Sequence, residues 1–98
     1  MDIDLIQMLW QAGDVEFTDE ALDRMDQREI TVENIGQAIM SGRIIEERSR
    51  ARPHAKCTVQ GWANRKAAGL DIGLYLLNVA CAVTDMLRII TIYWEREP

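Results

Sequence analysis

Two successive helix starts follow the same rule, and they constrain the fold of this chain more than any other feature. In each, a threonine stands at the N-cap, where its hydroxyl accepts a hydrogen bond from a free amide, between two hydrophobic residues that pack together across the cap. These groups are Thr18 with Phe17 and Leu22, and Thr31 with Ile30 and Ile35. The sequence therefore predicts helices over residues 19–28 and 32–41, joined by a short turn.

Apolar residues recur at helical spacing within both helices and define the faces that we expect to be buried. They are Ala21, Leu22 and Met25 in the first helix, and Ile35, Ala38 and Ile39 in the second. Glu29 stands at the sharp turn between them, where a positive φ is often needed, and that conformation costs a residue other than glycine about 1 kcal/mol. A third helix is predicted over residues 3–12, with Asp2 as its cap and Gly13 as its end.

After Gly42 the hydrophobic period changes from helical to extended. The sequence predicts strands over residues 43–47, 56–63, 72–83 and 86–94, with a short extended segment at 15–17. We expect a polar loop over residues 49–55, closed by Pro53, and a long connection over residues 64–71. The last two strands form a hairpin, and strict alternation places Arg88 and Tyr93 on opposite faces of the final strand.

These elements predict a single α+β domain of 98 residues. An N-terminal helix within residues 1–13 precedes a core over residues 17–98, in which two helices pack on a three- to four-stranded antiparallel sheet. Both faces of the final hairpin are apolar, and two short helices cover only one face. The other face needs the N-terminal helix, a second subunit in a homodimer, or a small protein partner.

Composition excludes several classes of protein. No charge-free run reaches the roughly 20 residues that cross a membrane, and the acidic N-terminus is unlike a secretory signal, so we expect a cytoplasmic protein. Cys57 and Cys81 are expected to be small buried hydrophobes, because one histidine, His54, near one cysteine supplies too few ligands for a metal. No motif for a cofactor is present, so none is predicted.

The charge is divided unevenly along the chain. Residues 1–40 hold ten acids and two bases, whereas residues 41–98 hold six acids and nine bases. Candidate contacts to a phosphate or an acidic partner are Arg43, Arg48, Arg50, Arg52, Lys56 and Arg88. His54, among these bases, is the candidate catalytic acid or base. The alternative is a solvated loop in which Glu46 and Glu47 pair with arginines, just as Arg24 and Arg28 are expected to pair with neighbouring aspartates.

From Phe17 onwards the chain resembles a family of small bacterial domains of unknown function. The family pattern begins Phe-Thr-x-His-Ala-Leu-x-Arg-Met-x-x-Arg-Gly-Ile and ends in a Leu-Arg-Ile-Ile-Thr-Val-Tyr strand. The matching residues are Phe17, Thr18, Ala21, Leu22, Arg24, Met25, Arg28, Ile30, Gly42, Ile44, Ile45, Glu46, Arg52, Pro53, Cys57, Gly61, Trp62 and residues 87–93. The family looks like a relative of the RelE and BrnT toxins, which implies a RelE-like fold.

Toxins of that fold cleave RNA and are neutralised by a small antitoxin, so the resemblance implies an endoribonuclease. The chain departs from the family at three positions, where Glu20 and Asn78 replace histidines and Glu29 replaces a glycine. Two hypotheses follow. The first is a non-catalytic relative that binds a protein or itself through an apolar sheet face. The second is a toxin-like endoribonuclease that uses the basic segment over residues 43–56 with His54.

Overall fold

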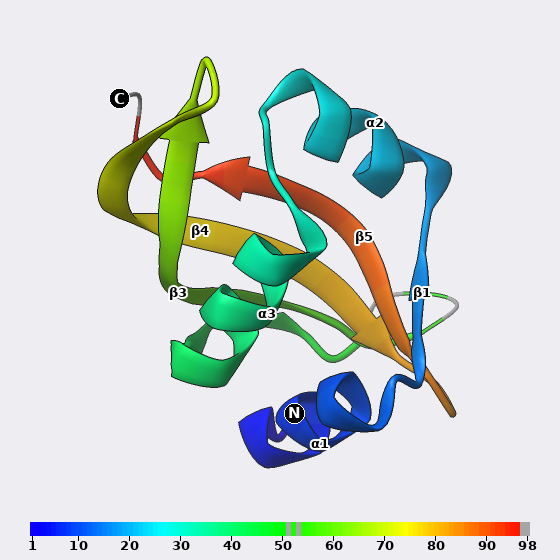
Figure 1. Ribbon diagram of the computed structural model, residues 1–98. Coiled ribbons are helices and arrows are strands. Elements are labelled where there is room, and N and C mark those ends of the chain that lie inside the picture. The colour runs from blue at the N-terminus through cyan, green and yellow to red at the C-terminus, as the bar shows by residue number, and fades with distance from the viewer. Residues whose placement is uncertain (51, 53, 97–98) are drawn as a thin grey trace.

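The computed structural model describes residues 1–50, 52 and 54–96 and contains three helices and one five-stranded sheet. Pro53, predicted to close the polar loop, lies outside the described residues. The strand order is β1-β5-β4-β3-β2 (Figure 1). The elements are α1 (Ile3–Ala12), β1 (Val15–Phe17), α2 (Asp19–Gln27), α3 (Val32–Ser41), β2 (Arg43–Arg48), β3 (Lys56–Ala67), β4 (Leu70–Val83) and β5 (Leu87–Trp94).

The three predicted helix starts are confirmed. Asp2 caps α1 and accepts from the amide of Asp4, and Gly13 ends that helix in the left-handed conformation. The Thr18 hydroxyl caps α2 by accepting from the amide of Ala21, and Thr31 forms a reciprocal capping box with Asn34 at α3. Helix entry is therefore encoded locally, through side chains that satisfy the first free amides of each helix.

The prediction of an antiparallel sheet is wrong, because the sheet is mixed. β1 runs parallel to β5, with Val15 opposite Leu87 and Phe17 opposite Ile89. The amide of Thr18 continues this pairing by donating to the Ile89 carbonyl at 3.0 Å. A strand of three residues is too short for hydrophobic alternation to predict its place in a sheet. Its position is determined by pairing with the free edge of β5.

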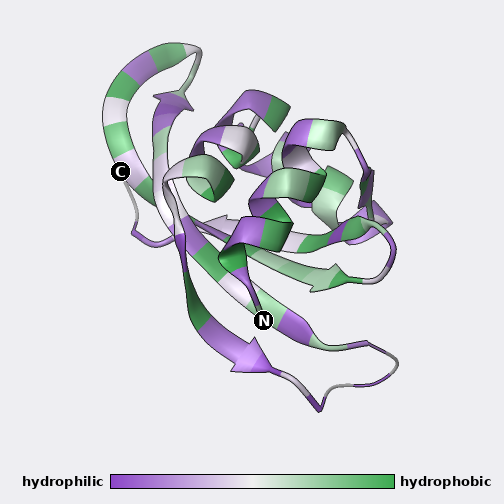
Figure 2. Cartoon of the chain, turned by 90° about the horizontal axis from the view of Figure 1, so that it is seen from below, coloured by the Kyte–Doolittle hydropathy of each residue, from purple (hydrophilic) through white to green (hydrophobic). Residues whose placement is uncertain are grey.

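The long connection predicted over residues 64–71 is also wrong. β3 and β4 are joined directly at Ala68 and Gly69, both with positive φ, so Ala67 pairs with Leu70 across a tight turn. Such a turn normally carries asparagine or glycine at its first position. Alanine at that position is not a turn signal, so the sequence does not predict the turn. Hydrophobic and hydrophilic residues alternate along the resulting long strands (Figure 2).

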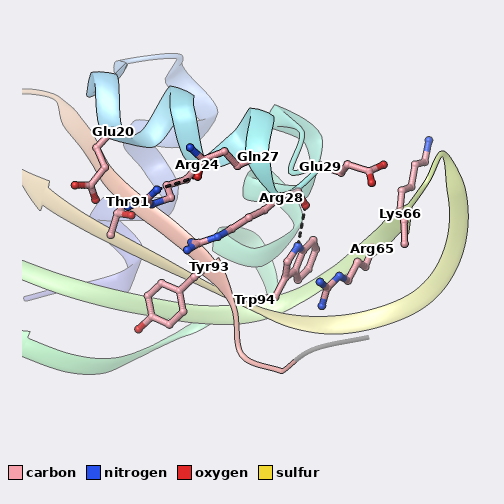
Figure 3. Close-up of a pocket in the computed structure, with 11 residues that line it drawn as sticks. Glu20, Arg24, Gln27, Arg28, Glu29, Arg65, Lys66, Thr91, Tyr93 and Trp94 are labelled. Carbon is pink, nitrogen blue, oxygen red and sulfur yellow. Dashed lines mark hydrogen bonds between the residues drawn. The ribbon is translucent and has the colours of Figure 1, made fainter.

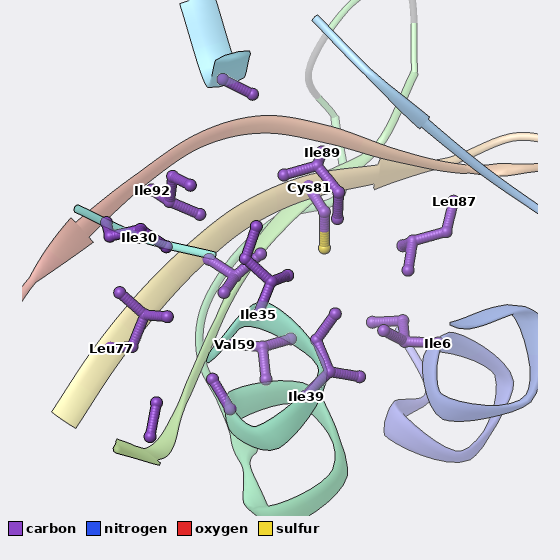
Figure 4. Packing of buried hydrophobic residues seen from close by; sticks show 14 of the residues in the cluster. Ile6, Ile30, Ile35, Ile39, Val59, Leu77, Cys81, Leu87, Ile89 and Ile92 are labelled. Carbon is purple, nitrogen blue, oxygen red and sulfur yellow. The ribbon is translucent and has the colours of Figure 1, made fainter. Parts of the chain in front are cut away.

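All three helices lie on one face of the sheet (Figure 1). The core between them contains Ile6 of α1, Ile35 and Ile39 of α3, and Val59 and Ile89 of the sheet (Figure 4). Each such fully buried side chain stabilises the fold by about 1.5–3 kcal/mol. The N-terminal helix therefore joins the face that the other helices already cover and leaves the opposite face open.

One predicted core residue is placed differently. Leu22 is 51% exposed, whereas Ala21 is fully buried and Met25 packs at the edge of the core. α2 packs on β5, near the edge of the sheet, so it buries a narrower stripe than its hydrophobic spacing indicates. In the described part of the chain, no helix is long and apolar enough to cross a membrane.

Candidate functional site

The candidate site is the face of the sheet that no described helix covers, here called the open face. On β3, Cys57, Val59 and Ala63 point into the core, so the residues between them point to the open face. Trp62 is one of these and is 50% exposed. Leu74 on β4, which is 61% exposed, shares this face through its pairing with Asn64. The open face therefore presents large apolar side chains to solvent.

A β-bulge in β5 changes which side chains share the open face. Strict alternation predicts Arg88 and Tyr93 on opposite faces, but the pairing with β4 shifts between Ala80 and Cys81. Arg88 pairs with Ala82 and Tyr93 with Asn78, and these partners lie on the same side of β4. The bulge therefore brings an arginine and a tyrosine onto one surface, as bulges often do near functional sites.

Three predicted site residues come together at one end of the open face. His54, Lys56 and Arg88 line one cavity of about 210 Å³, together with Thr18, Ala82 and Ile90. The sheet positions two of them, because Ala82 pairs with Lys56 on one side and with Arg88 on the other. This end of the face combines an imidazole with two cations.

The other predicted cations are more dispersed. Arg48 pairs with Lys56 across β2 and β3, and Arg43 faces the same side at the opposite end of β2. Arg50 and Arg52 are exposed in the connection between these strands. Part of the positive charge is neutralised locally. Among these cations, Arg48 pairs with Glu46 at 3.0 Å and Arg88 pairs with Glu16 at 3.7 Å. Both are exposed pairs of small energetic value.

The cavity around His54 contains few groups for acid–base chemistry. RNA cleavage needs a base, an acid and cations near the phosphate. No carboxylate lines this cavity among the described residues, so His54 has no carboxylate to orient or polarise it. Within the same part of the chain, no cluster of three histidine, cysteine or acidic side chains could hold a metal ion. Cys57 instead points into the core, where it pairs with Cys81.

The middle of the open face contains polar contacts that sequence reasoning missed. Asn78 is 1% exposed, and its carbonyl oxygen accepts from the Gln60 amide at 3.1 Å. Its own amide donates to the carboxylate of Glu95. One asparagine inside the apolar run of β4 could have indicated these contacts, because a buried side-chain amide needs hydrogen-bond partners. This chain of contacts fixes side chains between the apolar and basic ends of the open face.

Comparison with known proteins agrees with the expected resemblance at its broadest level. The model of a family described as "Domain of unknown function (DUF4258)" matches residues 17–94. This span begins at Phe17, before the first threonine cap, and ends at Trp94, the last residue of β5. No curated protein and no solved structure matches the chain. The relationship to the RelE and BrnT toxins stays a prediction.

Proposed function

We propose that this chain, which belongs to the DUF4258 family of domains of unknown function, is a non-catalytic binding module that pairs with a second copy of itself. One observation carries the proposal: all three helices lie on one face of the sheet, and the other face exposes Trp62, Leu74 and Tyr93. Apolar groups of this size gain free energy when an interface removes them from water.

The position of the apolar side chains supports a second copy as the occupant. Trp62 and Leu74 lie at one end of the open face beside Glu95 and Arg96, and Lys56 and Arg88 lie at the other end. A two-fold axis through the apolar end would place Trp62 and Leu74 of one copy against the same residues of the other. Such an arrangement buries these side chains at the centre of the interface and leaves Glu95 and Arg96, which carry opposite charges, at its rim. A small protein partner of another kind is the competing occupant.

A mass measurement in solution tests this proposal. Analytical ultracentrifugation over a wide concentration range should show a monomer–dimer equilibrium for the wild-type chain. Trp62→Arg should shift that equilibrium strongly towards monomer, because it places a charge at the apolar centre of the interface. Val32→Arg is the matched control, since Val32 is 52% exposed but lies on α3, on the helix side. A wild-type chain that stays monomeric at high concentration would contradict the proposal.

A toxin-like endoribonuclease neutralised by an antitoxin is the second candidate, favoured by the cavity that His54 shares with Lys56 and Arg88. These groups are of the kind that move a proton and stabilise a phosphate. Expression in a bacterial host without a partner gene tests it. The ribonuclease hypothesis predicts arrested growth and fragmented RNA that His54→Ala abolishes. Unimpaired growth with intact RNA would exclude it.

We also propose a cytoplasmic location. Two buried cysteines on paired strands, Cys57 and Cys81, support this location. Their sulfur atoms lie 3.6 Å apart and are not joined by a disulfide. Free thiols this close are typical of a reducing compartment. Mass spectrometry of the alkylated protein from its host should find both thiols free, and a Cys57–Cys81 disulfide would contradict this location.

A further inference from the structure

A groove between α2 and the ends of β3 and β5 is separate from the cavity that contains His54. It has a volume of about 690 Å³. Its lining includes Arg24 and Arg28 of α2, Arg65 and Lys66 of β3, and Trp94 of β5 (Figure 3). This volume falls within the usual range of about 300–1,000 Å³ for small-molecule sites.

The groove is cationic although the chain carries a net charge of −5. Three arginines and one lysine line it, against two glutamates. One of these glutamates is already engaged, because the Glu29 carboxylate accepts from the amides of Ala68 at 2.9 Å and Gly69 at 3.2 Å. Positive charge is therefore concentrated here against the overall charge of the protein.

The arginines of the groove are held by neutral acceptors. Arg24 donates to the side-chain oxygen of Gln27 at 2.9 Å, and Arg28 donates to the Ile92 carbonyl at 2.7 Å. Among the described residues, none of the groove's four cations lies within 4.0 Å of a carboxylate. The expected pairing of Arg24 and Arg28 with neighbouring aspartates is therefore wrong. Their positive charge remains available to a ligand.

Arg65 provides an independent observation that points to a ligand. Arg65 is only 8% exposed, and its guanidinium lies over the rings of both Tyr75 and Trp94, at 5.1 Å and 4.7 Å from their centroids. One terminal nitrogen donates to the Arg96 carbonyl at 2.7 Å, but the buried Nε has no partner among the described residues. A buried cation without a counter-charge is costly, so such an arginine typically serves an anion.

We propose that this groove binds a small organic phosphate. The guanidinium groups of Arg28 and Arg65 come from opposite sides of Trp94, and the indole of Trp94 donates to the Arg28 carbonyl and so ties the two sides together (Figure 3). Phosphate oxygens supply the acceptors and the negative charge that Arg65 lacks. The volume of the groove, about 690 Å³, leaves room for the organic part of the ligand beside the phosphate.

Isothermal titration calorimetry on the full chain tests this site with pyrophosphate, adenosine monophosphate and adenosine. Pyrophosphate and adenosine monophosphate should bind saturably, with one molecule per chain, and adenosine should not bind. Arg28→Gln and Lys66→Gln should each weaken binding about ten-fold, which is typical of losing one hydrogen bond to a charged group. Both side chains are exposed, so these variants should fold normally.

Gln11→Glu is the matched control, because it makes the same change in net charge at an exposed position of α1, outside the groove. It should leave the affinity unchanged. Trp62→Arg should also bind as the wild type does, which separates this site from the proposed dimer. No saturable binding of adenosine monophosphate, equal binding of adenosine, or an affinity that Arg28→Gln and Lys66→Gln do not lower would each overturn the proposal.

Discussion

At the scale of single residues, Glu29 shows how a strained backbone is compensated. Its φ of 52° lies in the left-handed region, as its position between two helices predicts. The sequence does not reveal why glutamate occupies a position that suits glycine. Its carboxylate holds the β3–β4 turn through the amides of Ala68 and Gly69, and these partners are 39 and 40 residues away in sequence.

Two substitutions separate the strain at Glu29 from its hydrogen bonds. Glu29→Ala loses both bonds and keeps the strain, whereas Glu29→Gly loses both bonds and relieves the strain. The glycine variant should therefore be more stable than the alanine variant by about 1 kcal/mol. Urea denaturation measures the difference. Equal stabilities would show that the strain at this position is negligible.

The Cys81 thiol gives a prediction for pH. A hydrogen bond with the Cys57 sulfur and burial raise the pKa of the Cys81 thiol. The folded chain then keeps a proton that the unfolded chain loses above its ordinary pKa of about 8.5. The free energy of unfolding should therefore fall as the pH rises above about 8.5. Urea denaturation across this range should show the fall in the wild type and a smaller one in Cys81→Ala.

At the scale of elements, the approach of α3 to β3 depends on Gly61. A Cβ atom at this position would lie 1.9 Å from the backbone oxygen of Ala38. Since that oxygen belongs to the helix backbone, the helix itself would have to move. No hydrophobic pattern reveals this contact, because it depends on the distance between two elements and not on the period of either.

Gly61→Ala should therefore destabilise the fold by about 3 kcal/mol. Gly69→Ala is the control, because its Cβ would meet nothing within 4 Å and only its φ of +80° opposes substitution. That control should lose about 1 kcal/mol. Thermal and urea unfolding of both variants measure the two losses. A mild effect at Gly61 would contradict the close packing of α3 on β3.

Element prediction succeeded where the signal is local. The helix caps at Thr18 and Thr31 and the final hairpin follow from neighbouring residues, and the structure confirms them. Predictions failed where the structure depends on which strands pair and in which register. β1 joins the sheet only through β5, and the turn at Ala68 lacks the usual residues. The bulge that brings Arg88 and Tyr93 together is equally hidden, because it appears only in the register with β4.

At the scale of the whole molecule, the sequence predicted an apolar second sheet face but not what covers it. α1 has an apolar stripe like the other helices, and only its packing against α3 shows which face it occupies. The candidate site was predicted in part. Lys56 and Arg88 line one cavity with His54. Arg65, in contrast, was expected in a connection between strands, whereas it lies on β3 and is buried, like Ala63 two residues before it.

Nuclear magnetic resonance can show residue by residue whether the open face mediates pairing of two copies. Amide spectra recorded over a dilution series report which residues change environment on association. Pairing through the open face should concentrate the shifts at Trp62, Tyr93 and their neighbours on that face and leave α1 and α2 unchanged. Spectra that do not change with concentration, or shifts concentrated on the helices, would contradict it.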